Sequence, residues 1–492
     1  MITKQDKDTI EPYLKDASNY HGSADIVYIP EDEKELIDIV DECFSKKIPI
    51  SVSGAGTGLG GARVPLGGAV ISLEKLNKII NVDTQKNIAV VQPGVLLYEL
   101  ETELEKYGLF YPPNPTEKNS SLGGNIGTNA SGSRTFKYGA TRNYIEGMKL
   151  ILSNNNLVYL KRGENISDTK SISFNNIEGE KITVPKPAYK MPSIKHTAGY
   201  YSADNMDAID LFIGSEGTLG LAYQLFINIT PIPEKVLGLI FFFDNYNNLL
   251  DFVDIARTKS RFNNQKDYHS INDISARLIE FYNKESLTLL SQKYPQIPKN
   301  ALGAVWIEQE YSEENESEIL EKWYELVEKY SSLSDDTWVA LNDKEHNNFR
   351  EFRHALPLAV NEILTRNGMR KFGTDIAVPD EFSHEIFFFL SEEISKSGLS
   401  SAVWGHIGNS HYHANVMANG TDELDRAKTF FDNSRTKAIA MGGTISGEHG
   451  IGKIKKKYLK QMYGENGIND MINIKKILDP YRLFGIGTLF DY

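Results

Sequence analysis

The sequence predicts an α+β protein of more than one domain, and three observations support this class. At 492 residues the chain is too long for one ordinary hydrophobic core, so two or three domains are expected. The N-terminal half alternates strand-like and helical segments with glycine-rich loops. From Pro233 to about Leu399 such segments continue without glycine loops, which places a domain boundary near Pro233.

The first elements form a short β-α-β unit. Apolar runs at 26–29 and 48–52 predict two strands, and the apolar residues between them recur at helical spacing. The unit ends directly in a glycine-rich loop, SGAGTGLGG, at 53–61. The segments that follow predict two more strands and an amphipathic helix, at 69–73, 88–91 and 95–107.

The composition excludes several classes of protein. Hydrophobic residues make up 40% and charged residues 24%, which is normal for a globular protein. The net charge of −13 argues against nucleic-acid binding, so an anionic substrate needs local positive charge. Cys43 is the one cysteine, which excludes disulfides and cysteine-ligated iron–sulfur clusters within the chain and fits a reducing compartment. We expect a cytoplasmic protein, with docking at the inner face of a membrane left open, because no apolar run is long enough to cross a bilayer.

Three glycine-bearing segments predict a phosphate-bearing ligand. Glycines that alternate with small residues allow successive backbone N–H groups to turn toward one anion. The loop at 53–61 has neither a Walker lysine nor Rossmann spacing, and one such loop alone would more often be structural. Two further segments, SLGGNIGTNASGSR at 121–134 and GSEGTLG at 214–220, favour a large ligand. The pyrophosphate of a dinucleotide fits best.

A group of histidines near the C-terminus predicts a divalent metal. A single histidine would more often be an ordinary hydrogen-bonded side chain than a ligand. In HYHAN, however, a strand would place His411, His413 and Asn415 on one face. His406 precedes this segment, and a carboxylate is available from the glycine-flanked GEHG loop. Two imidazoles and one carboxylate form a familiar metal set that leaves a coordination position open for chemistry.

Several long motifs resemble a known flavoenzyme family. PISVSGAGTGLGGARVP, YPPNPTEKNSSLGGNIGTNASGSRTFKYGATRNYIEGM and LFIGSEGTLG are similar to the FAD domain of the D-lactate dehydrogenase, glycolate oxidase flavin-subunit and D-2-hydroxyglutarate dehydrogenase group. The similarity runs from about His21 to the LDPYRLFGIG ending. It implies a two-subdomain FAD-binding domain of the PCMH (vanillyl-alcohol-oxidase) type, an α+β cap domain with an antiparallel sheet, and a C-terminal segment that returns to the FAD domain. The corresponding ranges are an N-terminal helical segment at 1–20, the FAD domain at 21–233, the cap with the metal site at 234–450, and the returning segment at 451–492.

The resemblance also implies which residues hold FAD. The first glycine loop would wrap the pyrophosphate, the second segment would line the flavin and ribityl side, and the third would close over the adenine end. No histidine lies in the first loop, where covalent relatives attach the flavin, so FAD is expected to be non-covalent. The family usually has arginine where this chain has Ser53, so the cradle is expected to rely more on backbone donors. The implied residues are Ser53, Gly54, Ala55, Gly56, Thr57, Gly58, Leu59, Pro115, Thr116, Gly123, Gly124, Asn125, Thr128, Asn129, Ala130, Glu216 and Gly217.

The same resemblance assigns the metal and catalytic residues. GHIGNSHYHAN is similar to the family motif G-H-x-G-D-G-N-x-H-x-N, and SGEHGIG matches outright. Carried over, His406, His413 and Glu448 would bind a divalent metal of the zinc type. His449 would be the catalytic base and Asn415 a substrate contact.

Four other positions carry expectations of their own. FREFRHALP resembles a family stretch that places Arg353 as the clamp for a substrate carboxylate, and the alternative is a surface salt-bridge partner. Asn409 replaces a usual aspartate, which could weaken the orientation of a ligand imidazole. Ser410 replaces glycine and puts the shape of the turn in doubt. His411 replaces asparagine, and we hypothesise either a third imidazole ligand or a polar substrate contact.

These residues predict a metal-assisted oxidation. A small anionic D-2-hydroxy acid of the lactate, glycolate or 2-hydroxyglutarate type would transfer hydride to flavin N5, while the metal polarises the hydroxyl and His449 takes its proton. Oxygen, a quinone, a cytochrome or an iron–sulfur partner subunit would reoxidise the flavin. A homodimer is left open. The alternatives are a same-fold reductase that uses NADPH, a metal-dependent hydrolase and a non-enzymatic flavin-binding subunit.

Overall fold

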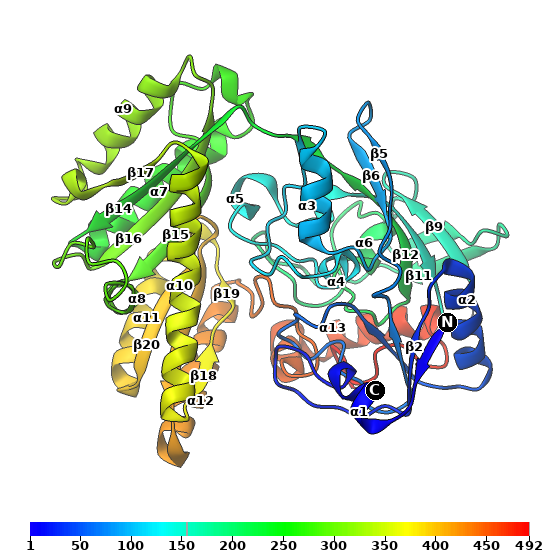
Figure 1. Cartoon of the computed structure of the whole chain (residues 1–492). Helices are drawn as coiled ribbons and strands as arrows, with labels where there is room; N and C mark the ends of the chain where they lie inside the picture. Colours follow the sequence, from blue (N-terminus) through cyan, green and yellow to red (C-terminus); the bar gives the residue numbers. More distant parts are fainter. Residues whose placement is uncertain (154–155, 492) are drawn as a thin grey trace. The chain divides into compact units, whose positions relative to one another are not determined.

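The computed structural model describes residues 1–153 and 156–491, and the chain forms two compact units (Figure 1). Neither unit is one continuous stretch of sequence. Unit 1 comprises Met1–Gly132, Gly139–Ile232 and Ser446–Tyr492, and unit 2 comprises Ser133–Tyr138 and Pro233–Ile445. Each unit has its own sheets and its own hydrophobic core.

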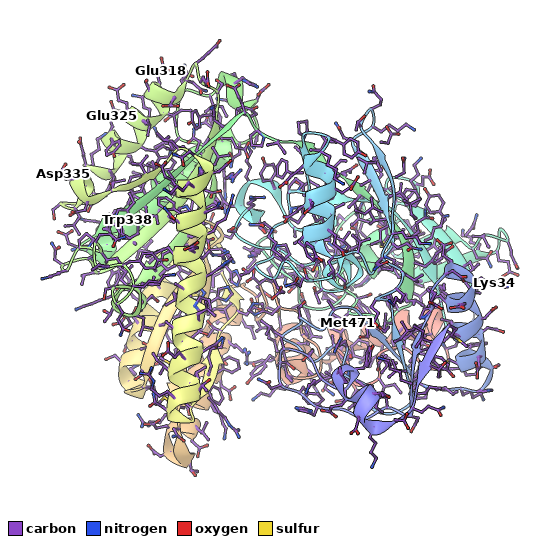
Figure 2. All side chains as sticks on the ribbon, viewed as in Figure 1. Lys34, Glu318, Glu325, Asp335, Trp338 and Met471 are labelled. Atoms are coloured by element: carbon purple, nitrogen blue, oxygen red, sulfur yellow. The ribbon has the colours of Figure 1, made fainter. Side chains whose placement is uncertain are left out.

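The first sheet of unit 1 contains the predicted β-α-β unit. Its strand order is β1(Ile2–Lys4)-β2(Ile26–Ile29)-β4(Ala69–Ser72)-β3(Ile50–Ser53). Both β2 and β3 pair with β4 in parallel, so the crossover through α2(Glu33–Ser45) skips one strand position. The Asp32 side chain caps α2 by accepting from the Glu35 backbone N–H. The apolar face of α2 is buried, and Lys34 on the opposite face is exposed (Figure 2).

The N-terminal segment differs from the expectation of a separate helical piece. Its first residues form β1, which pairs antiparallel with the edge of β2. A short helix α1(Lys7–Ile10) and a 3-10 turn η1(Glu11–Tyr13) follow, and both Ile10 and Tyr13 are buried against the first sheet. The pairing and the two apolar anchors make residues 1–20 part of unit 1.

The second sheet of unit 1 is antiparallel. Its order is β5(Ile79–Asp83)-β6(Ile88–Val91)-β12(Leu221–Asn228)-β8(Ile145–Ile151)-β9(Leu157–Lys161). Two small ladders accompany it, β7(Leu109–Phe110) with β13(Thr230–Pro231) and β10(Ser171–Asn175) with β11(Lys181–Pro185). The short helices are α3(Leu97–Glu105), α4(Leu122–Gly127) and α6(Ile209–Phe212).

The C-terminal segment packs within unit 1, as predicted. Helix α13(Lys456–Leu478) ends in a buried ion pair in which Lys475 Nζ lies 2.5 Å from Asp479 Oδ2. Phe484 then bridges to Ile50 of β3, and Met471 of α13 is fully buried (Figure 2). Residues 446–450, which the predicted ranges gave to the cap, also cluster with unit 1. The Thr197 backbone N–H donates to the Ser446 carbonyl there at 2.9 Å.

Unit 2 is built on one eight-stranded sheet, and the predicted antiparallel sheet of the cap is confirmed. Every strand pair in it is antiparallel. The order is β17(Trp338–Ala340)-β14(Lys235–Phe243)-β16(Gly303–Tyr311)-β15(Ala276–Asn283)-β20(Ser400–His406)-β21(His411–Ala418)-β18(Arg370–Gly373), and β19(Ile376–Ala377) also pairs with β21.

Alternate residues of these strands face two different helical layers. One face packs on α7(Tyr246–Asn263), α9(Glu316–Val327), α11(Ser383–Ser397) and α12(Gly420–Ala440). The other packs on α8(Lys284–Leu290) and α10(Asp343–Asn367). Helix α9 keeps Glu318 and Glu325 exposed (Figure 2). In the described part of the chain, no helix combines the length and apolar character that a membrane crossing requires.

Candidate functional site

Unit 1 contains a large cavity lined by all three glycine-bearing segments. It encloses about 1140 Å³, part of which is open solvent. The first glycine loop leaves β3, the second segment begins α4, and the third precedes β12, so three turns that are distant in sequence converge on one space. Of the residues predicted to hold the cofactor, those in the lining are Gly54, Ala55, Gly56, Thr57, Gly58, Gly123, Gly124, Asn125, Thr128, Glu216 and Gly217.

The remaining predicted cofactor residues lie outside the lining. Ser53 is buried beneath the first loop, and Leu59 is exposed. Asn129 has a left-handed backbone with φ 49°, and its Oδ1 accepts from the Arg142 backbone N–H. These positions shape the turns around the cavity. The set comprises Ser53, Leu59, Pro115, Thr116, Asn129 and Ala130.

The first glycine loop is held by Ser121 and by an arginine that sequence reasoning missed. Ser121 Oγ accepts from the backbone N–H groups of Gly124 and Ala55, which ties the first two glycine segments together. Arg63 lies behind the loop and lines the cavity. Its Nη1 donates to Ser53 Oγ at 3.1 Å and to the Gly54 carbonyl at 3.0 Å. A guanidinium therefore stands next to the position at which the family carries arginine.

Glu216 connects the third segment to the GEHG loop. Its backbone is left-handed, with φ 54°. Its two carboxylate oxygens accept from the backbone N–H groups of Ile451 and Gly452, each at 2.7 Å. Burial raises the pKa of Glu216 to about 7, although these two hydrogen bonds act in the opposite direction. The loop that carries Glu448 and His449 is thus fixed within unit 1.

His449 lines the same cavity, and its neighbour Glu448 has a buried cationic partner. The His449 Nε2 atom lies 3.4 Å from Glu448 Oε1. The other carboxylate oxygen, Oε2, lies 2.7 Å from Nζ of Lys195, whose side chain is 1% exposed. Lys195 was not predicted. Its signal in the sequence is weak, because it is one lysine in a segment without a recognisable spacing.

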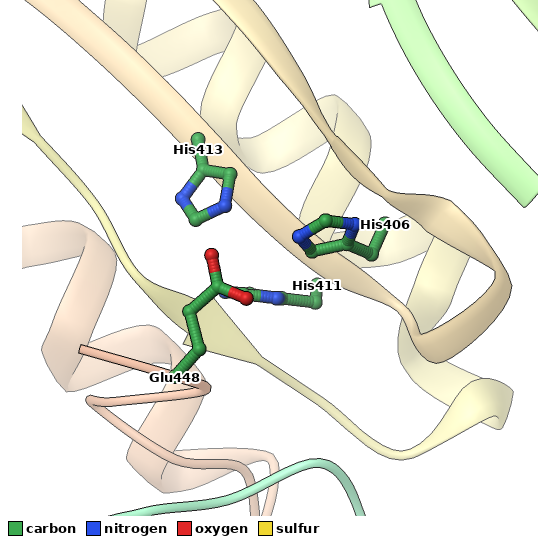
Figure 3. Close-up of side chains that lie close together, drawn as sticks. All are labelled: His406, His411, His413 and Glu448. Carbon is green, nitrogen blue, oxygen red and sulfur yellow. The ribbon is translucent and has the colours of Figure 1, made fainter. Parts of the chain in front are cut away.

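Three histidines come together on the sheet of unit 2 (Figure 3). His406 ends β20 and pairs in register with His411, the first residue of β21. His413 follows two residues later on the same face. The ring centroids of His406 and His411 are 5.2 Å apart, and those of His411 and His413 are 4.5 Å apart. Each ring offers one nitrogen within 4.8 Å of a nitrogen on each of the others.

An oxygen atom holds each of these imidazoles. Glu280 Oε1 lies 2.5 Å from His406 Nδ1, and Asp375 Oδ1 lies 3.0 Å from His411 Nε2. The Thr374 carbonyl oxygen lies 3.3 Å from His413 Nδ1. Such contacts fix the orientation of a ring that binds a metal.

The turn before β21 accommodates Ser410, whereas the Oδ1 atom of Asn409 is buried without a hydrogen-bond partner among the described residues. The carboxylates that contact His406 and His411 belong to Glu280 of β15 and to Asp375 of the β18–β19 segment. These two imidazole rings are therefore oriented without an aspartate at position 409. Ser410 adopts the left-handed conformation with φ 49°, and its Oγ donates to Asp380 Oδ1 at 3.0 Å.

Arg353 and Asn415 lie on the same face of the unit 2 sheet. Arg353 is on α10 with a side chain that is 14% exposed, so it is not a surface residue. Its Nη2 atom lies 3.1 Å from Oε2 of Glu280, the residue that also holds His406. Asn415 Nδ2 donates to the His413 carbonyl at 2.9 Å. The predicted clamp and the histidines therefore share one buried carboxylate.

Buried acidic residues on β16 extend this polar face, and sequence reasoning missed them. Glu308 Oε2 lies 2.5 Å from Arg277 Nη2, and Glu310 Oε2 lies 2.5 Å from Lys137 Nζ. Arg277 holds the pKa of Glu308 well below its usual range, against the effect of burial. Acidic residues at alternate positions of the apolar run VWIEQEY are the signal that could have revealed them.

Comparisons with known proteins agree with the predicted resemblance. The FAD binding domain family matches residues 24–161, and the family of FAD linked oxidases, C-terminal domain, matches residues 269–488. D-lactate dehydrogenase of Anaerostipes hadrus is 30% identical, and glycolate oxidase subunit GlcD of Bacillus subtilis is 29% identical. Each alignment covers 97% of this chain and 92% of the relative. D-2-hydroxyglutarate dehydrogenase of Stutzerimonas stutzeri is 25% identical over 99% of this chain and 95% of its own length.

The fold is similar to that of solved structures at lower identity. Alkyldihydroxyacetonephosphate synthase in one crystal form superposes with a TM-score of 0.67 at 15% identity, over 98% of this chain and 81% of the other. A second crystal form gives a TM-score of 0.63 at 14% identity, over 98% and 82%. The predicted α+β fold class is confirmed.

Proposed function

The chain belongs to the FAD-linked oxidase family, and from that premise we propose that it oxidises a D-2-hydroxy acid of the lactate, glycolate or 2-hydroxyglutarate type to the 2-oxo acid. That it is an FAD-dependent oxidoreductase follows from the family. The names of the relatives support the substrate class, because three of them are named for glycolate, D-lactate and D-2-hydroxyglutarate.

The observation that carries the proposal is the position of His449. It lies in the wall of the glycine-lined cavity that suits a large phosphate-bearing cofactor. FAD bound in this cavity would supply the acceptor for a hydride from the substrate α-carbon. A neutral imidazole at this wall can take the hydroxyl proton as the hydride leaves, since the ordinary pKa of histidine is about 6.5.

The substrate carboxylate needs a positive group on a chain of net charge −13. Arg353 is the proposed clamp. One edge of its guanidinium pairs with Glu280, and a guanidinium has five N–H donors in a planar fork. Glu280 orients this fork, and Asn415 is the proposed second polar contact of the substrate.

We propose that His406, His413 and Glu448 hold a divalent metal of the zinc type. The donors suit such an ion, because imidazoles held by oxygen atoms and a carboxylate are typical of catalytic zinc. A metal held by these residues would supply a Lewis acid that lowers the cost of removing the hydroxyl proton. Lys195 Nζ lies 2.7 Å from the Oε2 atom of Glu448 and so fixes the position of this carboxylate.

A substrate panel tests the function. Purified protein should be yellow and should release FAD on denaturation, which also tests non-covalent binding. Under anaerobic conditions one D-2-hydroxy acid should bleach the flavin absorbance, and its L-enantiomer serves as the control where one exists. The His449→Asn variant should keep its FAD, and its rate of flavin bleaching should fall by about 100-fold or more. Bleaching by NADPH and by no hydroxy acid would overturn the proposal.

The compartment and the electron acceptor are parts of the same proposal. Cys43 is buried, and burial raises the pKa of its thiol to about 12, which fits an unreactive thiol in a cytoplasmic enzyme. Without cysteine ligands for a cluster, the electrons must pass to an external acceptor or to an iron–sulfur partner subunit.

A further inference from the structure

We infer that His411 is a third imidazole ligand, so that β20 and β21 carry a three-histidine metal site within unit 2. The inference rests on the proposed function for the presence of a metal, and it goes beyond it in naming a ligand that the family motif lacks. At this position the motif has asparagine, whose amide is a weaker ligand than imidazole for a zinc-type ion.

Backbone geometry brings the third ring into the cluster. His406 and His411 are directly opposite each other in the β20–β21 ladder, and residues paired in this way carry neighbouring side chains. His413 occupies the next position on the same face of β21. The rings of His406 and His413 are 5.6 Å apart between centroids, so all three pairs lie within a similar distance (Figure 3).

The hydrogen bonds select which nitrogen each ring presents to a metal. Glu280 Oε1 lies 2.5 Å from Nδ1 of His406 and the Thr374 carbonyl oxygen lies 3.3 Å from Nδ1 of His413, so Nε2 is the nitrogen that each ring would offer to a metal. Asp375 takes Nε2 of His411, so this ring presents Nδ1. A carboxylate or carbonyl on the far nitrogen is the usual arrangement behind a metal-binding histidine.

Burial makes an ordinary structural role for His411 less suitable than ligation. The side chain is fully buried, and Asp375 beside it is 2% exposed. A structural core position would be filled at lower cost by an apolar residue, because a buried carboxylate carries a large desolvation penalty. A divalent cation on the other side of the ring offsets that penalty, since it attracts the carboxylate through the imidazole.

Two consequences follow for the chemistry of the metal. A third imidazole is neutral, so it would add a donor to the proposed set of His406, His413 and Glu448 without removing further charge from the ion. Three imidazoles also favour zinc, copper and nickel over magnesium or calcium. Unit 2 should therefore retain zinc even when Glu448 is removed.

The test is zinc affinity, measured by competition with a chromophoric chelator. His411→Asn restores the family residue and should raise the zinc Kd by about 10–100-fold, and Asp375→Asn should act in the same direction through orientation of the ring. Glu448→Gln should raise it less than His411→Asn. The matched control is His346→Asn, which removes a buried histidine of the same unit that contacts the Val236 carbonyl instead.

X-ray absorption at the zinc edge of the wild-type holoenzyme gives a second readout that needs no variant. Three imidazoles in the scattering pattern support the inference, and two overturn it. The affinities separate the two proposals. If His413→Asn weakens zinc binding and His411→Asn does not, the third ligand is wrong and the proposed function stands. If neither variant changes zinc binding, the metal of the proposed function fails as well.

Discussion

Glu216 stabilises a loop contact through its carboxylate, although burial makes the charged form of that carboxylate unfavourable. Its carboxylate is buried against the GEHG loop and accepts two backbone N–H groups, yet the desolvation it suffers dominates its pKa. The residue also sits in a left-handed conformation that glycine would adopt more readily. Both features indicate that the contact with Ile451 and Gly452 determines the side chain at this position.

The raised pKa of Glu216 predicts a pH-dependent stability. Between pH 4.5 and about 7 the folded protein binds a proton that the unfolded chain releases, so the free energy of unfolding should fall as pH rises through this window. The total change is roughly 3 kcal/mol at most. Urea titrations at several pH values should show this slope, and Glu216→Gln should flatten it. The control Glu318→Gln, at an exposed position, should leave the slope unchanged. An unchanged slope in the Glu216→Gln variant would contradict the prediction.

Arg63 predicts a difference between two flavins. Its Arg63→Met variant should bind FAD about 10-fold or more weakly, because a charge that supports the loop beside the diphosphate is lost. Riboflavin has no diphosphate, so its affinity should hardly change. Fluorescence titration of the apoprotein measures both, with Arg63→Lys as the conservative control. Equal weakening of both flavins would mean that Arg63 acts only by holding the loop.

At the level of single residues, the sequence indicates the residues that lie within local motifs more readily than the residues that contact those motifs from elsewhere in the chain. The glycine segments and the histidines are recognisable because their chemistry depends on residue type at fixed local spacing. Lys195 and Glu280 could not be predicted, because each acts through a partner distant in sequence that only the fold brings near. Arg63 was missed although its partner Ser53 is only ten residues away, because nothing in the sequence shows that the loop folds back onto it.

Among the elements, the strand and helix predictions follow from simple periodicity. The strand predicted at 26–29 matches β2, and HYHAN begins β21. The helix predicted at 95–107 is shorter in the structure, where α3 spans Leu97–Glu105. What periodicity could not predict is the insertion of β4 between β2 and β3, because strand order depends on packing between distant segments.

The contact between the GEHGIG loop and the first glycine loop gives an element-scale prediction. Gly452 has φ 55°, and a Cβ there would overlap the backbone of Gly60. Gly452→Ala should therefore destabilise the protein by more than the roughly 1–2 kcal/mol that a left-handed alanine costs, and it should weaken FAD binding. Gly163→Ala, with φ 86° and open space around it, is the matched control. Chemical denaturation and FAD titration check both variants, and equal costs would contradict the steric argument.

For the whole molecule, separate cores predict separate responses to ligands. Unit 1 contains the glycine-lined cavity, and unit 2 contains the three histidines. We expect two calorimetric transitions, one raised by FAD and the other by zinc. Each ligand should contribute about 2.7 kcal/mol at a concentration roughly 100 times its Kd. A single transition that both ligands raise equally would show that the units unfold together.

The interleaved chain path has a consequence for biosynthesis. The chain passes between the units at 132/133, 138/139, 232/233 and 445/446, so the nascent polypeptide begins unit 1 but cannot finish it until α13 and the residues after it leave the ribosome. The long stretch Pro233–Ile445 is synthesised earlier, and its sheet can form before α13 of unit 1 has been synthesised. The half that is translated first is therefore the half that matures last, and a released chain that ended at residue 445 would contain all of unit 2 but only part of the flavin cradle.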